Sequence, residues 1–207
     1  MSSFKIVCVG RNYRKHAEEL GNQVPASPIL FLKPPSSLVE PGQPIELPPV
    51  SNQVDYEGEI GVIIGTRLKD AGPDEARAAV RGIVAANDVT ARDVQKSDGQ
   101  WTRGKGFDTF CPVGPMGEAP DDLSTLQVVT RVNGAERQRG RASDMLFDIP
   151  ALLSFISGVM TLEPGDLVLT GTPEGVGKLA AGDEVEVEVV GPSTGVSRVT
   201  NPVREKT

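Results

Sequence analysis

The sequence contains few of the residues that build disulfides, zinc sites or imidazole-based active sites. Its 207 residues include two cysteines and one histidine. Two cysteines are too few for a disulfide framework, so we expect Cys8 and Cys111 to be buried, reduced thiols of a cytoplasmic protein. A zinc site is disfavoured because the chain has no cluster of histidine and cysteine ligands. Because His16 is the single histidine, any reaction that needs an imidazole would have to use it.

Long apolar runs and an excess of positive charge are also missing from the sequence. No stretch is long enough to cross a bilayer, and residues 1–5 lack the core of a signal peptide. The net charge of −7 argues against a nucleic-acid partner. The nucleophile-elbow pentapeptide of Ser-His-Asp hydrolases does not occur. We therefore expect a cytoplasmic protein that binds neither membranes nor nucleic acids.

Glycine and proline, in contrast, are frequent, and 23 glycines and 17 prolines divide the chain into many short segments. Apolar and alternating runs predict strands at residues 5–9, 29–32, 45–47, 57–64, 82–87, 127–132, 166–169, 184–190 and 197–200. Asn133-Gly134 predicts a hairpin turn, with residues 136–139 as the returning strand. Helical patterns are few and short, at residues 13–20, 73–80 and 150–160. The sequence thus predicts an α+β, sheet-dominated fold in a single domain over residues 1–207, with residues 1–49 as its most irregular part.

The segment 55–65 carries the most informative cluster of acidic residues. Its β-branched residues predict a strand, in which Glu57 and Glu59 share one face. A third carboxylate, Asp88, follows the apolar run 82–87. Two glutamates and an aspartate at strand ends are ligands that a hard divalent cation prefers. The alternative interpretation is a solvated strand edge, where charges discourage aggregation.

His16 lies in a short predicted helix that we expect to begin at Asn12 as N-cap and to end at Gly21. Glu19 follows His16 by three residues, so both lie on one helical face, where the carboxylate can orient the imidazole. Because so short a helix depends on packing, it is a candidate for a segment that becomes ordered over a ligand. The alternative is an exposed polar helix whose histidine has no function.

Two glycine-rich segments are further candidates for ligand binding. Residues 99–105 match the spacing of a P-loop, but Gly106 stands where Ser or Thr is required, so nucleotide hydrolysis is rejected. Lys105 between two glycines indicates close approach of the backbone to an anionic ligand. The alternative is a flexible surface loop. Residues 170–177 follow a predicted strand and offer the Thr172 hydroxyl and backbone amides to a ligand, although ordinary turns have the same composition.

Taken together, the motifs resemble those of the fumarylacetoacetate hydrolase family, and the match extends in order over nearly the whole chain. The matching segments are residues 9–13 with His16 and Glu19, residues 28–34, 55–59, 87–95, Trp101, residues 105–108, 111–112, 169–173 and 175–177. The short length resembles the compact acylpyruvase branch (fumarylacetoacetate hydrolase domain-containing protein 1). The resemblance implies a mixed β-sandwich or β-roll around Mg²⁺ or Mn²⁺, usually in a homodimer.

The same resemblance implies roles for individual residues. Glu57, Glu59 and Asp88 match the metal ligands of the family. His16 and Glu19 match a water-activating pair on a lid helix at about residues 12–20, and Lys105 matches the active-site lysine. Gln95 and Thr172 are candidate hydrogen-bond partners of a bound acid. Apart from the resemblance, Arg11, Arg14 and Arg103 are candidates for binding a distal carboxylate of the substrate, and Arg11 is the predicted substrate-binding residue. The alternative for each of them is a surface charge without a function.

The implied activity is metal-dependent hydrolysis of a carbon–carbon bond in acylpyruvates, 2,4-dioxo acids such as fumarylpyruvate or acetylpyruvate, to pyruvate and a carboxylic acid. Breakdown of aromatic compounds is the expected context. The alternatives are an oxaloacetate decarboxylase or tautomerase and a 2-hydroxyhepta-2,4-diene-1,7-dioate isomerase, which form the same enolate at the same metal. A non-catalytic protein that binds a metal or a 2-oxo acid is a further class.

Overall fold

The computed structural model describes residues 4–19, 21, 23–192 and 195–206. The strands are β1 Ile6–Gly10, β2 Ile29–Lys33, β3 Leu38–Val39, β4 Ile45–Leu47, β5 Val54–Tyr56, β6 Gly58–Ile64, β7 Val80–Asn87, β8 Thr90–Ala91, β9 Cys111–Pro112, β10 Gln127–Val132, β11 Ala135–Arg141, β12 Leu167–Leu169, β13 Gly177–Lys178, β14 Glu184–Val190 and β15 Gly195–Glu205. The α-helices are α1 Arg14–Glu19, α2 Pro73–Ala78, α3 Arg92–Asp98, α4 Thr102–Lys105 and α5 Ile149–Val159. Three short 3-10 helices are η1 Pro35–Ser37, η2 Leu123–Thr125 and η3 Ala142–Asp144.

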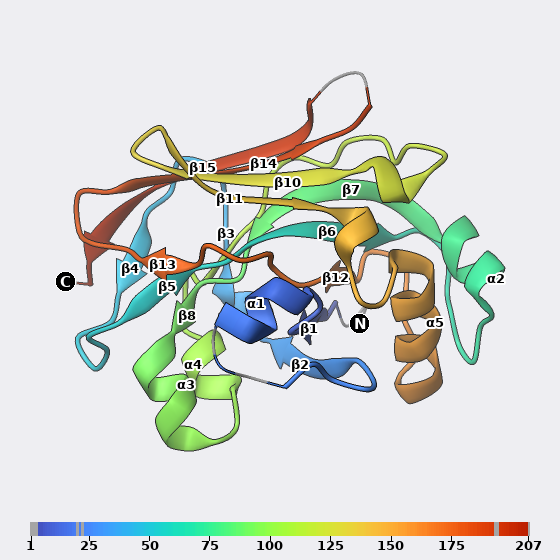
Figure 1. Ribbon diagram of the computed structural model, residues 1–207, viewed down its shortest axis with the longest axis horizontal. Helices are drawn as coiled ribbons and strands as arrows, with labels where there is room; N and C mark the ends of the chain where they lie inside the picture. Colours follow the sequence, from blue (N-terminus) through green and yellow to red (C-terminus); the bar gives the residue numbers. More distant parts are fainter. Residues whose placement is uncertain (1–3, 20, 22, 193–194, 207) are drawn as a thin grey trace.

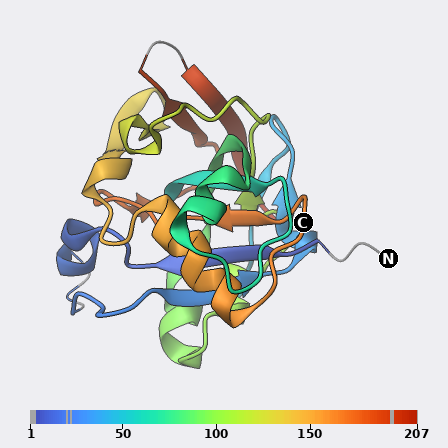
Figure 2. The same cartoon turned by 90° about the vertical axis from the view of Figure 1, so that its right-hand side faces the viewer.

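Two five-stranded sheets form the framework. The first has the order β2-β1-β12-β6-β7 and the second β11-β10-β14-β15-β4. In Figure 1 the second sheet lies across β6 and β7, and Figure 2 shows the same two layers from the side. Apolar side chains such as Val62 of β6 and Val187 of β14 belong to one buried cluster between the sheets. The α5 helix adds Leu152, Leu153 and Ile156 to this cluster at one end.

The pairing of β6 with β7 places the acidic residues side by side. The two strands run antiparallel with Gly58 opposite Asn87 and Glu59 opposite Ala86. The start of β6 therefore meets the end of β7, and the Asp88 amide donates to the Glu57 carbonyl at 2.8 Å. Two segments separated by about thirty residues thus bring three carboxylates to one edge of the sheet.

The turn between β10 and β11 shows how local sequence defines a strand pair. Asn133 and Gly134 have φ angles of 52° and 77°, the left-handed values of a two-residue hairpin turn. The predicted hairpin is thereby confirmed. The predicted ranges of β4, β10 and β14 agree with the structure, and the sheet-dominated α+β class is confirmed as well.

Some local predictions were wrong. The helix predicted at residues 73–80 ends at Ala78, because Val80 already begins β7. The helices α3 and α4 were not predicted, since their sequence is polar and interrupted by Gly99 and Gly104. A Cβ on Gly104 would lie 2.8 Å from the Gln95 Cα, so this glycine allows α3 and α4 to pack closely. In the described part of the chain, no helix has the length and apolar character needed to cross a membrane.

Candidate active site

The three predicted metal ligands meet in the interior of the protein. Glu57 follows β5, Glu59 lies in β6 and Asp88 follows β7. All three side chains are buried, and one carboxylate oxygen of each lies within 4.8 Å of the others. A solvated strand edge is therefore the wrong interpretation of this cluster. Buried charges of like sign persist only where cations compensate them.

Three buried cations surround the carboxylates. Lys33 of β2 donates to Asp88 at 2.6 Å, and Lys105 of α4 donates to Glu57 at 2.7 Å and also to Asp88. Arg92 of α3 donates to Asp55 at 2.9 Å and also to Glu57. Each of these cations comes from a different element, so the charge balance of the site exists only in the folded chain.

The pKa values of the site reflect these contacts. Burial by itself would raise the pKa of Glu57, but Lys105 and Arg92 outweigh it and hold that pKa below its usual range. Burial by itself would lower the pKa of Lys105, but Asp88 and Glu57 raise it, so its amine remains protonated at neutral pH. Glu57 and Lys105 thus act as a charged pair within the pocket.

Glu59 is the carboxylate that fits a metal best. Its side chain accepts from the Gly171 amide at 2.7 Å, and no ion pair with Lys, Arg or His is formed by it among the described residues. Burial and the neighbouring Asp88 raise its pKa well above the usual value. A divalent cation would supply the missing positive charge to three hard oxygen ligands, so the residues present fit Mg²⁺ or Mn²⁺.

His16 projects from α1 into the same region. Its side chain is buried, so the exposed histidine of the alternative interpretation is wrong. The His16 Nδ1 lies 3.7 Å from Glu19 Oε2, and this nitrogen has no hydrogen-bond partner in the part of the chain that the structure describes. Burial lowers the pKa of His16, so its imidazole is neutral at pH 7 and can accept a proton. Glu19 itself accepts from the Gly175 amide at 3.1 Å.

Asn12 attaches this helix to the rest of the site, although the expected N-cap role was wrong. The α1 helix begins at Arg14, and the Asn12 amide group accepts from the Phe147 amide at 2.9 Å and donates to the Phe147 and Thr170 carbonyls. Asn12 therefore connects the start of α1 to the loop that follows β12. The predicted stop at Gly21 agrees with its φ of 67°, while Leu20 lies outside the described residues.

A cavity of about 290 Å³ brings the predicted residues together. Of the nine predicted site residues, Glu19 does not line it. The eight that do are Arg11, His16, Glu57, Glu59, Asp88, Gln95, Lys105 and Thr172. Lys105 is buried and lies in the short helix α4, so a flexible surface loop was the wrong alternative. The amide oxygen of Gln95 accepts from Arg92 at 3.0 Å, which leaves its nitrogen as the donor for a ligand.

Sequence reasoning assigned no role to Lys33, Arg92 or Gln138. Lys33 directly follows the apolar run 29–32, and a lysine that ends such a run was a usable signal for a buried cation. Arg92 lies four residues after Asp88, within a segment already matched to the family. Gln138 gave no signal beyond its inward position on the returning hairpin strand.

Gln138 connects three segments around the carboxylates. Its amide oxygen accepts from the Gly58 amide at 2.9 Å, and its amide nitrogen donates to the Thr172 hydroxyl at 2.8 Å and to the Pro173 carbonyl at 2.9 Å. The Thr172 hydroxyl in turn donates to the Gly58 carbonyl. Thr172 is thus largely engaged within the protein, which leaves one acceptor position of its oxygen for a ligand.

We expect Gln138→Leu to destabilise the protein and to weaken metal binding. The substitution leaves the Gly58 amide and the Pro173 carbonyl without their partners, at a cost of about 1–3 kcal/mol for each buried group. Gly58 separates two of the proposed metal ligands, so their spacing should loosen. Denaturant unfolding and Mg²⁺ titration measure the two effects. Gln127→Leu on the neighbouring strand is the control, and equal stability of the two variants would contradict the prediction.

The chain is similar to proteins of one known family. Residues 5–204 match the family described as "Fumarylacetoacetate (FAA) hydrolase C-terminal". The chain is 43% identical to the mitochondrial oxaloacetate decarboxylase of Dictyostelium discoideum, over 92% of this chain and 90% of the relative. It is 42% identical to the oxaloacetate tautomerase YcgM of Escherichia coli, over 91% of this chain and 90% of the relative.

A solved structure agrees with these matches. The crystal structure of 2-hydroxyhepta-2,4-diene-1,7-dioate isomerase from Mycobacterium marinum superimposes with a TM-score of 0.88 at 46% identity. The match covers 99% of this chain and 75% of that one. A family match over almost all of the described residues, together with relatives above 40% identity, leads to one conclusion. The chain belongs to the fumarylacetoacetate hydrolase family.

Proposed function

We propose that this protein catalyses metal-dependent enol chemistry on 2-oxo dicarboxylic acids such as oxaloacetate, as keto–enol tautomerisation or decarboxylation. The observation that carries the proposal is the buried cluster of Glu57, Glu59 and Asp88 beside protonated Lys105, all lining one cavity. Two relatives above 40% identity bear the names oxaloacetate decarboxylase and oxaloacetate tautomerase, which supports this substrate class.

A divalent cation bound by Glu57, Glu59 and Asp88 would act as a Lewis acid toward the 2-oxo acid end of the substrate. The Lys105 ammonium donates a hydrogen bond where negative charge develops on the 2-oxo oxygen. Neutral His16 accepts the proton that leaves C3, and the electron pair of the broken C–H bond forms the carbon–carbon double bond of the enolate. The enolate oxygen then takes a proton to give the enol. Glu19, 3.7 Å from the imidazole, stabilises the positive charge that His16 then carries.

Decarboxylation places different demands on these residues. The bond between C3 and the distal carboxylate breaks, carbon dioxide leaves, and the electron pair remains on the enolate, which is then protonated at C3. No base is needed to remove a proton before the bond breaks. Lys105 therefore matters for both reactions, whereas His16 matters most for tautomerisation.

Acylpyruvate hydrolysis is the second candidate, and the proximity of His16 and Glu19 favours it. A neutral imidazole beside a carboxylate is suited to take a proton from water as that water attacks a carbonyl. The isomerase named in the Mycobacterium marinum structure indicates a third reaction of the same kind, in which protons move within an unsaturated dicarboxylate.

The proposal is tested by assaying oxaloacetate and acetylpyruvate side by side. Enol formation, carbon dioxide release and acetylpyruvate cleavage should be followed with Mg²⁺, with Mn²⁺ and with chelator. Because free metal promotes both oxaloacetate reactions, the matched control is Glu59→Gln protein at the same metal concentration. We expect oxaloacetate to give the higher kcat/KM. Absence of any turnover of oxaloacetate above the control would overturn the proposal, and cleavage of acetylpyruvate alone would favour the second candidate.

A further inference from the structure

One wall of the cavity alternates between cations and aromatic rings. The Arg11 guanidinium carbon lies 5.7 Å from the centroid of the Trp101 ring. The Trp101 and Phe31 rings meet edge-on with centroids 5.2 Å apart, and Lys105 Nζ lies 5.1 Å from the Phe31 centroid. All four side chains line the cavity. Lys105 marks the end near the carboxylates, and Arg11 carries a second positive charge on the same wall.

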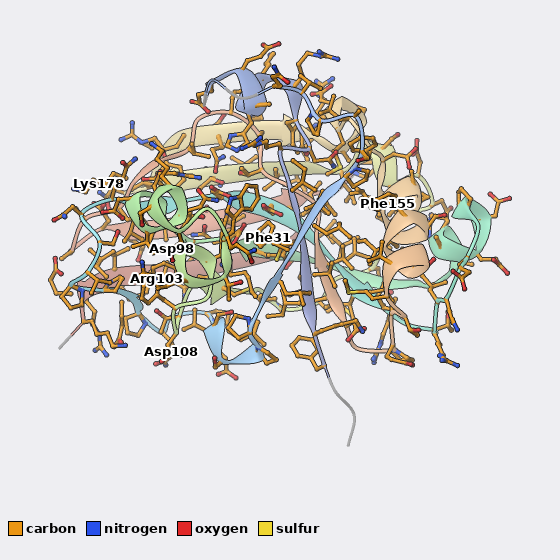
Figure 3. All side chains as sticks on the ribbon, turned by 90° about the horizontal axis from the view of Figure 1, so that it is seen from below. Phe31, Asp98, Arg103, Asp108, Phe155 and Lys178 are labelled. Atoms are coloured by element: carbon orange, nitrogen blue, oxygen red, sulfur yellow. The ribbon has the colours of Figure 1, made fainter. Side chains whose placement is uncertain are left out.

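The structure distinguishes Arg11 from the other two arginines that were candidates for a distal carboxylate. Arg103 is exposed and bonds Asp98 through two nitrogens, one of them at 2.6 Å, and Figure 3 shows the pair at the molecular surface. Arg14 is exposed and does not line the cavity. Arg11 is half-buried in the cavity wall and pairs with no carboxylate among the described residues. Its donors are therefore available to a ligand.

The backbone at Arg11 is held in an uncommon conformation. Its φ is 57°, in the left-handed region that residues with long side chains rarely adopt. Both neighbours keep it there: Asn12 is clamped by its three hydrogen bonds, and Gly10 packs under Trp101 so closely that an added Cβ would lie 2.6 Å from the ring. Such strain persists where the surroundings enforce it, commonly at ligand-binding sites.

We propose that Arg11, held against Trp101, binds the distal carboxylate of the substrate and selects 2-oxo dicarboxylates over 2-oxo acids with an uncharged end. This inference rests on the proposed function, because it assumes that the 2-oxo acid end lies at Glu57, Glu59 and Asp88. The guanidinium lies over the Trp101 ring, 5.7 Å from its centroid, and its N–H groups pair with no carboxylate among the described residues. Those groups match the two oxygens of a carboxylate.

A matched pair of unreactive ligands tests the selection. Malate and lactate both carry a 2-hydroxy acid group in place of the 2-oxo acid group of the substrate. Malate alone has a distal carboxylate. With excess Mg²⁺, we expect Arg11→Gly to lower malate affinity by about tenfold to a hundredfold, the usual effect of losing a charged hydrogen bond, and to leave lactate affinity unchanged. Trp101 is the sole tryptophan, so its fluorescence reports binding without turnover. Two control variants also remove one positive charge each: Arg14→Gln lies outside the cavity, and Lys96→Gln lines it.

Stability measurements separate recognition from folding. Glycine adopts the φ of residue 11 without steric cost, so the melting temperature of Arg11→Gly should be unchanged or higher in the absence of metal. Arg11→Asn is the second variant, since asparagine also tolerates this conformation, and it should show the same selective loss. Equal loss of malate and lactate affinity in both variants, or no loss, would overturn the inference.

The kinetic experiment distinguishes this inference from the proposed function. If wild-type protein with Mg²⁺ turns over oxaloacetate, while Arg11→Gly raises KM for oxaloacetate and leaves KM for acetylpyruvate unchanged, both stand. If wild-type protein turns over oxaloacetate but Arg11→Gly behaves like Arg14→Gln, the inference alone fails. If wild-type protein does not turn over oxaloacetate, the proposed function fails, and only the malate and lactate comparison still bears on Arg11.

Discussion

Replacement of Glu59 by glutamine is expected to abolish binding of Mg²⁺ or Mn²⁺ and, with it, turnover of every substrate. The amide preserves the shape of the side chain but removes the one carboxylate charge of the site that no lysine or arginine neutralises among the described residues. Three buried oxygens with reduced negative charge no longer compensate for dehydration of a divalent cation. Chelator should reduce wild-type activity to the same level, and added metal should restore it in the wild type alone.

Thermal unfolding provides a readout of the same change that does not depend on activity. A cation at a hundred times its Kd stabilises a protein by about 2.7 kcal/mol, or about 5–10 °C for a chain of this length. Glu59→Gln should lose this shift. Without metal, it should melt at the wild-type temperature or above, because burial and the neighbouring Asp88 disfavour the charged form of Glu59, which forms no ion pair among the described residues. The exposed Glu184→Gln is the control. A normal metal shift in Glu59→Gln would exclude this site as the metal centre.

Replacement of His16 by alanine is expected to lower tautomerisation and acylpyruvate hydrolysis by about two to four orders of magnitude in kcat, the usual contribution of a positioned general base. Both reactions need a proton removed, from C3 in one case and from water in the other. Oxaloacetate decarboxylation should lose less, because its bond breaks without a base. The prediction is tested by measuring kcat of wild type and His16→Ala for all three reactions, with oxaloacetate and acetylpyruvate as substrates.

A second variant in α1 controls for effects of His16→Ala on the helix itself. Lys15, the preceding residue, is 76% exposed in its side chain, so Lys15→Ala changes α1 without changing the cavity. Metal affinity should be the same in His16→Ala as in the wild type, because His16 is not a ligand in the proposed site. An equal loss in all three reactions would show that His16 serves closure of α1 over the site, and proton transfer would then have to be assigned elsewhere.

Local sequence was a sufficient guide wherever the structure depends on near neighbours. The strand Glu184–Val190 alternates between valine and glutamate, and in the structure its inward valines are buried as period-2 alternation requires. The Asn133-Gly134 turn followed in the same way from the rarity of residues that accept left-handed φ values. The helices α3 and α4 were missed because α4 has four residues and lies against α3 through a glycine, so tertiary packing determines both.

The sequence by itself determined the sheet-rich class, the family and the candidate residues that line one cavity in the structure, because strand patterns and motif residues are properties of short segments. Tertiary structure alone decided which cations neutralise the carboxylates of the site. Lys33, Arg92 and Lys105 reach the other carboxylates from β2, α3 and α4, whereas Glu59 forms no ion pair with any described residue. Of three candidate arginines, Arg11 alone lines the cavity. Burial and ion pairing depend on distances between segments far apart in the chain, and those distances exist only after folding.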